Sequence, residues 1–168
     1  KGYNIEILFS EGDSAVEATN IDTLVSKGAK IIIITAHDSG AAESAGERAM
    51  EAGVKVIAYD RIVDVEGVSF YVTFDSVVVG QEQGQFLIDN ATGKDNELYL
   101  FSGGTWEGNA PLFFRGAWEA LQPKIADGTF KVMNIPAHTE FIDKAVLTTE
   151  EALVMMKQAD TDWSPEAT

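Results

Sequence analysis

The sequence predicts an α/β fold made of β-α-β units with parallel sheets, and three features of its pattern support this class. Short runs rich in Ile, Val and aromatic residues recur along the chain and have the length of strands. Segments with apolar residues at helical spacing lie between these runs. Glycines follow several of the expected helices, where the backbone has to leave the helix. Strands that alternate with helices in this way run parallel and are joined by right-handed crossovers.

The first part of the chain is expected to contain four strands and two helices. The first helix is expected where Val16, Ile21 and Leu24 recur at near-helical spacing. The second begins at Asp38 or Ser39, because either side chain can cap it. The expected strands cover residues 3–9, 29–35, 54–59 and 68–74. The second of these strands is an unbroken β-branched run, which is typical of a parallel strand covered on both faces.

The same alternation continues in the second part of the chain. Ser164 followed by Pro165 indicates the start of one more helix. Because the units before and after Thr73 have a similar layout, we expect two lobes, at residues 1–73 and 74–168. The further expected elements are helices at 77–91, 110–121 and 144–158 and strands at 97–102 and 130–135.

Charge and composition exclude several classes of partner. The 168 residues include 27 Asp and Glu but only 12 Lys and Arg, which gives a net charge of −15. Such a chain repels nucleic acid and acidic membrane surfaces at long range, so no nucleic-acid partner is expected. No run approaches the roughly 18 apolar residues of a membrane-spanning helix. The absence of cysteine excludes disulfides and thiolate metal sites.

Polar residues follow the expected strands at the sheet edge where open parallel sheets bind ligands. They are His37 and Asp38, then Asp60 and Arg61, and then the glycine-containing loop at 103–109. The carboxylate of Asp60 and the guanidinium of Arg61 could accept from and donate to adjacent hydroxyl groups of one sugar ring. The alternative is an ion pair that only holds the neighbouring loop.

Trp106 and Asn109 are the second pair of candidate ligand-binding residues. The amide of Asn109 could bridge two hydroxyl groups, and the indole of Trp106 could pack on the apolar face of a pyranose. Asn109 could instead be only a helix cap, and Trp106 only a surface or hinge aromatic. Trp118 lies on the apolar stripe of the following helix, which indicates a core residue.

The sequence gives no positive evidence for a metal, a cofactor or catalysis. His37 and His138 lack the spacing of a zinc site. The glycines form neither of the common phosphate-binding motifs, and neither histidine has a nucleophile beside it in the sequence. We therefore expect no metal, no cofactor and no enzymatic activity.

Several segments resemble the bacterial xylose-binding and multiple-sugar-binding periplasmic proteins. They are VIAYDRI at 56–62, FYVTFDSVVVG at 70–80 and GGTWEGNA at 103–110. The resemblance implies that Asp60, Arg61 and Asn109 contact the sugar. The family loop usually has two adjacent asparagines, whereas Gly108 occupies the first of those positions here. Trp106 has no reliable family equivalent, so its role is a local prediction.

The resemblance also implies a fold and a function. The fold would be a type I periplasmic-binding-protein fold in partial form, truncated at both ends, since family members are longer. The protein would bind xylose, glucose or a related aldose between two lobes, outside the cytoplasm in the periplasm or as a cell-surface lipoprotein. It would deliver this monosaccharide to the permease of an ABC importer without spanning the membrane. The alternative is the sugar-sensing domain of a transcription regulator or of a sensor-kinase partner.

Overall fold

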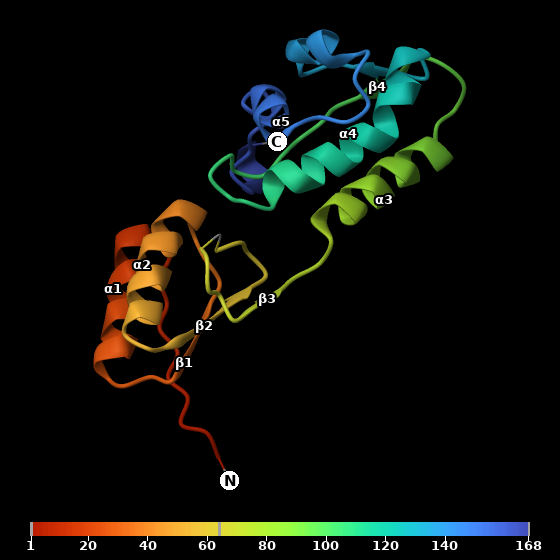
Figure 1. The fold of residues 1–168 in the computed structure, drawn as a ribbon. Coiled ribbons are helices and arrows are strands. Elements are labelled where there is room, and N and C mark those ends of the chain that lie inside the picture. The colour runs from red at the N-terminus through yellow and green to blue at the C-terminus, as the bar shows by residue number, and fades with distance from the viewer. Residues whose placement is uncertain (1, 64, 168) are drawn as a thin grey trace. The chain divides into compact units, whose positions relative to one another are not determined.

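The computed structural model of the 168-residue chain describes residues 2–63 and 65–167 (Figure 1). The chain divides into two compact units, Lys1–Thr73 (unit 1) and Phe74–Thr168 (unit 2). Each unit contains helices and parallel strands, which confirms the predicted α/β class. The expected outer ends of the two lobes, at Lys1 and Thr168, lie outside the described residues.

Unit 1 contains a three-stranded parallel sheet in the order β1-β2-β3. Its strands are β1 (Ile31–Ile34), β2 (Lys55–Tyr59) and β3 (Phe70–Val72), all within the ranges predicted from the sequence. Helix α1 (Ser14–Ser26) precedes β1, and α2 (Ser39–Glu51) connects β1 to β2. Asp38 caps α2, as predicted, because its Oδ1 accepts a hydrogen bond from Ala41 N at 2.8 Å.

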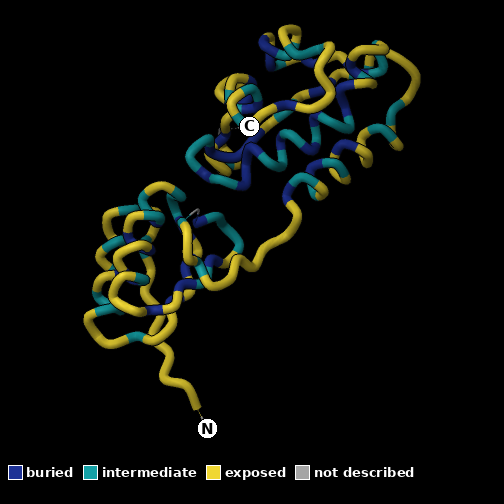
Figure 2. Tube along the Cα trace, in the orientation of Figure 1, coloured by how far each residue is buried: buried dark blue, intermediate teal, exposed yellow. Residues whose placement is uncertain are grey.

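The core of unit 1 lies between the sheet and its two helices. The burial of β1 alternates, with Ile32 and Ile34 buried and Ile31 and Ile33 exposed, as Figure 2 shows along the trace. The prediction that this strand is covered on both faces is therefore wrong for the described residues, because both helices pack on one face. The core residues are Ile21, Ile32, Ile34, Ala36, Ala42, Ala45, Ala49, Val54, Val56, Ala58 and Val63.

The segment at 3–9 is not a strand, which corrects a second prediction. Its alternate residues Tyr3, Ile5, Ile7 and Phe9 are all exposed. A strand requires backbone pairing with a neighbouring chain segment, and the described residues provide only side-chain partners here. One of these is the amide of Asn20, which donates to Phe9 O at 3.2 Å.

Unit 2 contains a two-stranded parallel sheet of β4 (Asn96–Leu98) and β5 (Phe130–Val132). Both strands are shorter than predicted, because side chains replace the backbone partners beyond Leu98. The amide of Asn134 accepts from Leu100 N at 3.0 Å and donates to Leu100 O at 2.7 Å. Further along, Ser102 forms a parallel bridge with Asp160.

Helices α3 (Ser76–Asp89) and α4 (Ala110–Ala126) pack against each other in unit 2 (Figure 1). Three glycines allow the close approach of their backbones. A Cβ atom at Gly80 would lie 2.1 Å from Phe113 O, and one at Gly116 would lie 2.0 Å from Val77 O. A Cβ atom at Gly84 would lie 2.8 Å from the Cβ atom of Ala120. The spacing of four residues between Gly80 and Gly84 therefore serves helix packing rather than phosphate binding.

The end of unit 2 folds around α4. Helix α5 (Thr149–Met156) begins later than predicted, because Thr148 and Glu151 form a capping box at its start. The preceding segment is held by Trp118, whose indole N–H donates to Lys144 O at 2.8 Å. Trp118 is 1% exposed, which confirms the predicted core position. A short 3-10 helix covers Pro136–Phe141. A single 3-10 turn covers Pro165–Ala167, where the sequence predicted a helix start.

Candidate ligand-binding site

The predicted polar residues of unit 1 lie just beyond the carboxyl ends of β1 and β2. His37 and Asp38 follow β1, and Asp60 and Arg61 follow β2 directly. The two strands are neighbours in register, with Ile34 beside Ala58, so these residues lie at one edge of the sheet. All four are partly buried. This edge is where ligands bind to open parallel sheets.

Asp60 has a backbone conformation that is rare for a residue with a side chain. Its φ angle is +65°, in the left-handed region, where Asp and Asn are tolerated better than most residues. Neighbouring groups hold this conformation: Asp60 N donates to Val72 O at 2.8 Å, and Asp60 O accepts from the hydroxyl of Thr73 at 2.7 Å. Backbone strain of this kind tends to occur at functional sites, where it directs a side chain.

Arg61 is connected to the loop that follows β1. Its guanidinium Nη1 donates to the carbonyl oxygen of Ala36 at 3.2 Å. The N–H of the same peptide group, on His37, donates to the Oε2 atom of Glu17 at 2.9 Å. Glu17 comes from α1 and was not among the predicted site residues, since a single Glu on a helix gives no sequence signal.

Two tryptophans cover the glycines that follow β4 in unit 2. A Cβ atom at Gly103 would lie 1.9 Å from the indole of Trp163, and one at Gly104 would lie 2.2 Å from Nε1 of Trp106. The absence of side chains at these glycines admits the protein's own aromatic rings. The indole N–H of Trp106 donates to the Oδ1 atom of Asp162 at 2.5 Å, which fixes the ring.

Asn109 occupies the N-cap position of α4, but its side chain makes no capping hydrogen bond. Glu107 caps the helix in its place: Oε1 accepts from Asn109 N at 2.8 Å, and Oε2 accepts from Ala110 N at 3.1 Å. Glu107 and Asn109 are 3% and 4% exposed. The side chain of Asn109 therefore does not cap α4, and Glu107, which the sequence did not single out, caps it instead.

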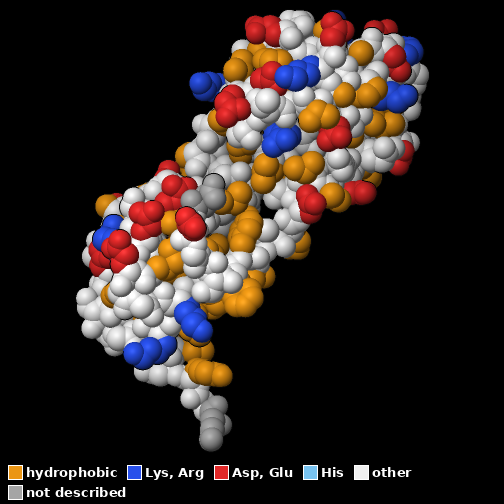
Figure 3. All heavy atoms as spheres, in the orientation of Figure 1, with side chains coloured by type: hydrophobic (Ala, Val, Ile, Leu, Met, Phe, Trp, Pro, Cys, Tyr) orange, Lys and Arg blue, Asp and Glu red, His pale blue; other side chains and the backbone are white. Residues whose placement is uncertain are grey.

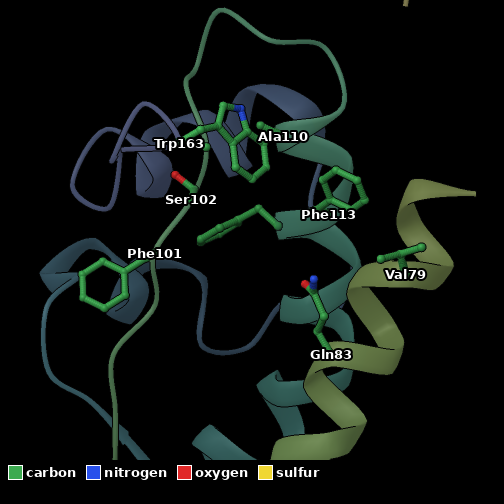
Figure 4. Close-up of a pocket in the computed structure, with 9 residues that line it drawn as sticks. Val79, Gln83, Phe101, Ser102, Ala110, Phe113 and Trp163 are labelled. Carbon is green, nitrogen blue, oxygen red and sulfur yellow. The ribbon is translucent and has the colours of Figure 1, made fainter. Parts of the chain in front are cut away.

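A cavity of about 280 Å³ lies in unit 2 beside this loop (Figure 4). Its lining includes Val79 and Gln83 of α3, Phe113 of α4, and Ser102 and Trp163. The rings of Phe113 and Trp163 meet edge to face, with their centroids 6.4 Å apart. Trp163 directly precedes the helix start expected at Ser164, and nothing in the sequence indicated its contribution to this wall.

Asp60 and Arg61 therefore lie at the carboxyl edge of the sheet in unit 1, whereas Trp106 and Asn109 belong to the loop and helix start of unit 2. Acidic side chains occur on both units in the view of Figure 3. Within residues 2–63 and 65–167, no three His, Asp or Glu side chains converge to hold a metal ion. None of the helices in this described part is long and apolar enough to cross a membrane.

Comparison with known families gives a match over almost the whole chain. A family described as "Periplasmic binding protein domain" matches residues 1–166. A multiple sugar-binding periplasmic protein of Azospirillum brasilense is 36% identical over 137 residues, which cover 79% of this chain and 38% of that protein. A D-xylose-binding periplasmic protein of Haemophilus influenzae is 28% identical over 95% of this chain and 46% of that protein. The chain thus spans less than half the length of these relatives.

Solved structures show the same fold. A carbohydrate transporter solute-binding protein of Chloroflexus aurantiacus, in complex with D-glucose, is 48% identical and superposes with a TM-score of 0.94. The match covers 98% of this chain and 49% of that one. An ABC transporter solute-binding protein of Clostridium phytofermentans, with bound β-D-glucose, is 26% identical, with a TM-score of 0.78 over 99% of this chain and 48% of that one. The predicted partial type I periplasmic-binding-protein fold is thereby confirmed.

Proposed function

Because the chain belongs to the periplasmic binding protein domain family, we propose that it binds a monosaccharide and delivers it to an ABC sugar importer. The proposed ligand is an aldose such as glucose or xylose. The names of the relatives and the bound glucose of the Chloroflexus aurantiacus structure support this class of ligand. The proposed location is outside the cytoplasm, as for the periplasmic relatives.

The strained Asp60 and its neighbour Arg61 are the observation that carries the proposal. A carboxylate accepts hydrogen bonds and a guanidinium donates them, so the pair can bind adjacent hydroxyl groups of one ring. Asp60 is held in the left-handed region by hydrogen bonds from the end of β3, which fixes the direction of its side chain. We propose that Asn109 and Trp106 provide further contacts from unit 2.

The two units are proposed to act as lobes that close on the sugar about the connection near Thr73. In proteins that work this way, hinge closure creates the surface that a partner protein recognises. No covalent bond of the ligand is made or broken. The permease of the importer is the proposed partner. The sugar-binding and transporter names of the relatives favour import over the sugar-sensing role in gene regulation or signalling.

Calorimetric titration of the product of the whole gene with D-glucose, D-xylose, D-galactose and L-arabinose tests the proposal. At least one aldose should bind with 1:1 stoichiometry and should raise the melting temperature by mass action. Chromatography of the sugar after incubation should recover it unchanged. A protein that binds none of these aldoses, or that converts one at a rate proportional to protein concentration, contradicts the proposal.

A further inference from the structure

A buried carboxylate lies directly behind the candidate site of unit 1. Glu17 is in the first turn of α1 and is 9% exposed. Its Oε1 atom is buried and has no hydrogen-bond partner among the described residues, whereas Oε2 accepts from His37 N. A buried carboxylate with one unsatisfied oxygen is costly, so its presence needs a reason beyond packing.

The contacts of Glu17 lead to Arg61 through a single peptide group. The group that joins Ala36 to His37 donates its N–H to the Glu17 carboxylate at 2.9 Å. It accepts, at its carbonyl oxygen, a hydrogen bond from Nη1 of Arg61 at 3.2 Å. Hydrogen bonds arranged in series polarise each other, so a negative charge at the donor end strengthens the carbonyl as an acceptor. Two hydrogen bonds, one on each side of this peptide group, thus link the guanidinium of Arg61 to the buried carboxylate of Glu17.

The electrostatics of Glu17 argue against a purely stabilising role. Burial raises the pKa of Glu17, and the hydrogen bond from the His37 backbone and the charges of His37 and Arg61 offset this only partly, while Asp38 adds to it. A raised pKa means that ionising Glu17 costs more free energy in the folded protein than in water. The carboxylate is therefore held at a cost in folding stability that an exposed glutamate would not have.

We propose that Glu17 is a positioning residue for Arg61, acting through the Ala36–His37 peptide, so that the guanidinium fork is oriented toward the bound sugar. This inference rests on the proposed function, because it assigns Arg61 to a sugar contact. The orientation of Arg61 itself, however, can be measured without any ligand.

Side-chain NMR of arginine in the ligand-free chain tests the positioning. The chain contains three arginines, Arg48, Arg61 and Arg115, so ¹⁵N-arginine labelling gives few signals. Glu17→Gln should shift or broaden the Nε–Hε signal of Arg61 and leave that of Arg115 unchanged. The matched control is Asp22→Asn, which should change only Arg48, because Asp22 pairs with Arg48 at 3.1 Å. An Arg61 signal that is unchanged in Glu17→Gln overturns the inference.

A double-mutant cycle on sugar affinity provides the second readout. Glu17→Gln should weaken D-glucose binding by about five- to tenfold in the wild-type background and by less than about twofold in an Arg61→Ala background, since coupled residues are not additive. Equal losses of affinity in both backgrounds mean that Glu17 does not act through Arg61. That result overturns the inference. If the wild-type protein binds no aldose, the proposed function fails, and the NMR comparison alone decides the positioning.

Discussion

Asp60 and Arg61 are adjacent in sequence, but the fold constrains them differently. The backbone of Asp60 is fixed in the left-handed region by bonds to β3. The side chain of Arg61 is fixed by the Ala36 carbonyl in the loop after β1. The pair is thus held by both neighbouring strands of the sheet. Two rigid polar groups at the carboxyl edge are suited to a ligand with adjacent hydroxyl groups.

Substitution of either residue should weaken sugar binding without unfolding the protein. Asp60→Asn is the better test at residue 60, because Asn tolerates the positive φ angle that Ala would not. Each charged hydrogen bond is worth about 1.5–3 kcal/mol, so Asp60→Asn and Arg61→Ala should each raise the Kd by roughly 10- to 150-fold. Calorimetric titration measures this change, and melting curves on the same samples report the fold.

The matched controls for this experiment are Asp22→Asn and Arg48→Ala. They remove an exposed ion pair of the same two residue types from α1 and α2 of the same unit. Because exposed pairs contribute about 0–1 kcal/mol to stability, the controls should leave both affinity and melting temperature nearly unchanged. If Asp60→Asn and Arg61→Ala lower the melting temperature but leave the affinity within about twofold, the pair is structural.

Glu17 should also affect how the stability of the protein depends on pH. Burial raises its pKa in the folded state, so its favourable contribution is complete below its unfolded pKa and is lost as pH rises through the folded pKa. The glutamine side chain of the Glu17→Gln variant cannot ionise, so the variant does not lose this stability as the pH rises. The melting temperature of the variant minus that of the wild type should therefore increase between about pH 4 and about pH 8. A difference that stays constant or decreases over this range contradicts the raised pKa.

Among the elements, helices α3 and α4 depend on glycine at their contact. Their backbones approach so closely that a methyl group at Gly116 would overlap Val77 O and lie 2.9 Å from Gln81 N. Backbone atoms cannot move aside as a flexible side chain can. The pair of helices thus tolerates no Cβ at this position, although Ala has the higher helix propensity.

Gly116→Ala should therefore destabilise unit 2, by about 1–3 kcal/mol or more if the helices must separate. The control is Gly46→Ala in α2, which is also buried and helical but whose new methyl group would make ordinary contacts with Val63 and Val65, at 3.6 and 3.7 Å. That control should be neutral or stabilising by up to about 1 kcal/mol. Chemical denaturation of both variants measures the difference, and equal stability of the two would refute this account of the helix contact.

At the scale of the whole molecule, each unit has its own hydrophobic core. Both units also leave apolar side chains exposed, visible among the charged groups in Figure 3. In unit 1, β1 is at one end of the sheet order, and Ile31 and Ile33 are 55% and 65% exposed. An apolar edge strand is a template for pairing with another chain.

The 168-residue chain should consequently self-associate as its concentration rises. Size-exclusion chromatography with light scattering should show a mass above the 18.2 kDa of the monomer. Replacement of Ile31 and Ile33 by Lys should reduce this association, because charged edge residues oppose pairing. Val154→Lys, at an exposed position of α5 in unit 2, is the control and should have no such effect. A wild-type chain that stays monomeric at high concentration contradicts the prediction.

The sequence by itself determined the alternation of helices and strands from α1 to α5 and the position of Asp60 and Arg61 at a strand end. Local patterns in the sequence reveal helical periodicity, caps such as Asp38 and the core position of Trp118, because each of these depends on residues near one another in the chain. Only the tertiary structure decided which residues that are far apart in the sequence contact each other. It showed that Glu17 reaches the loop after β1 and that the indoles of Trp106 and Trp163 cover Gly103 and Gly104. It also showed that residues 3–9 form no strand, because a strand requires a partner that no local pattern supplies.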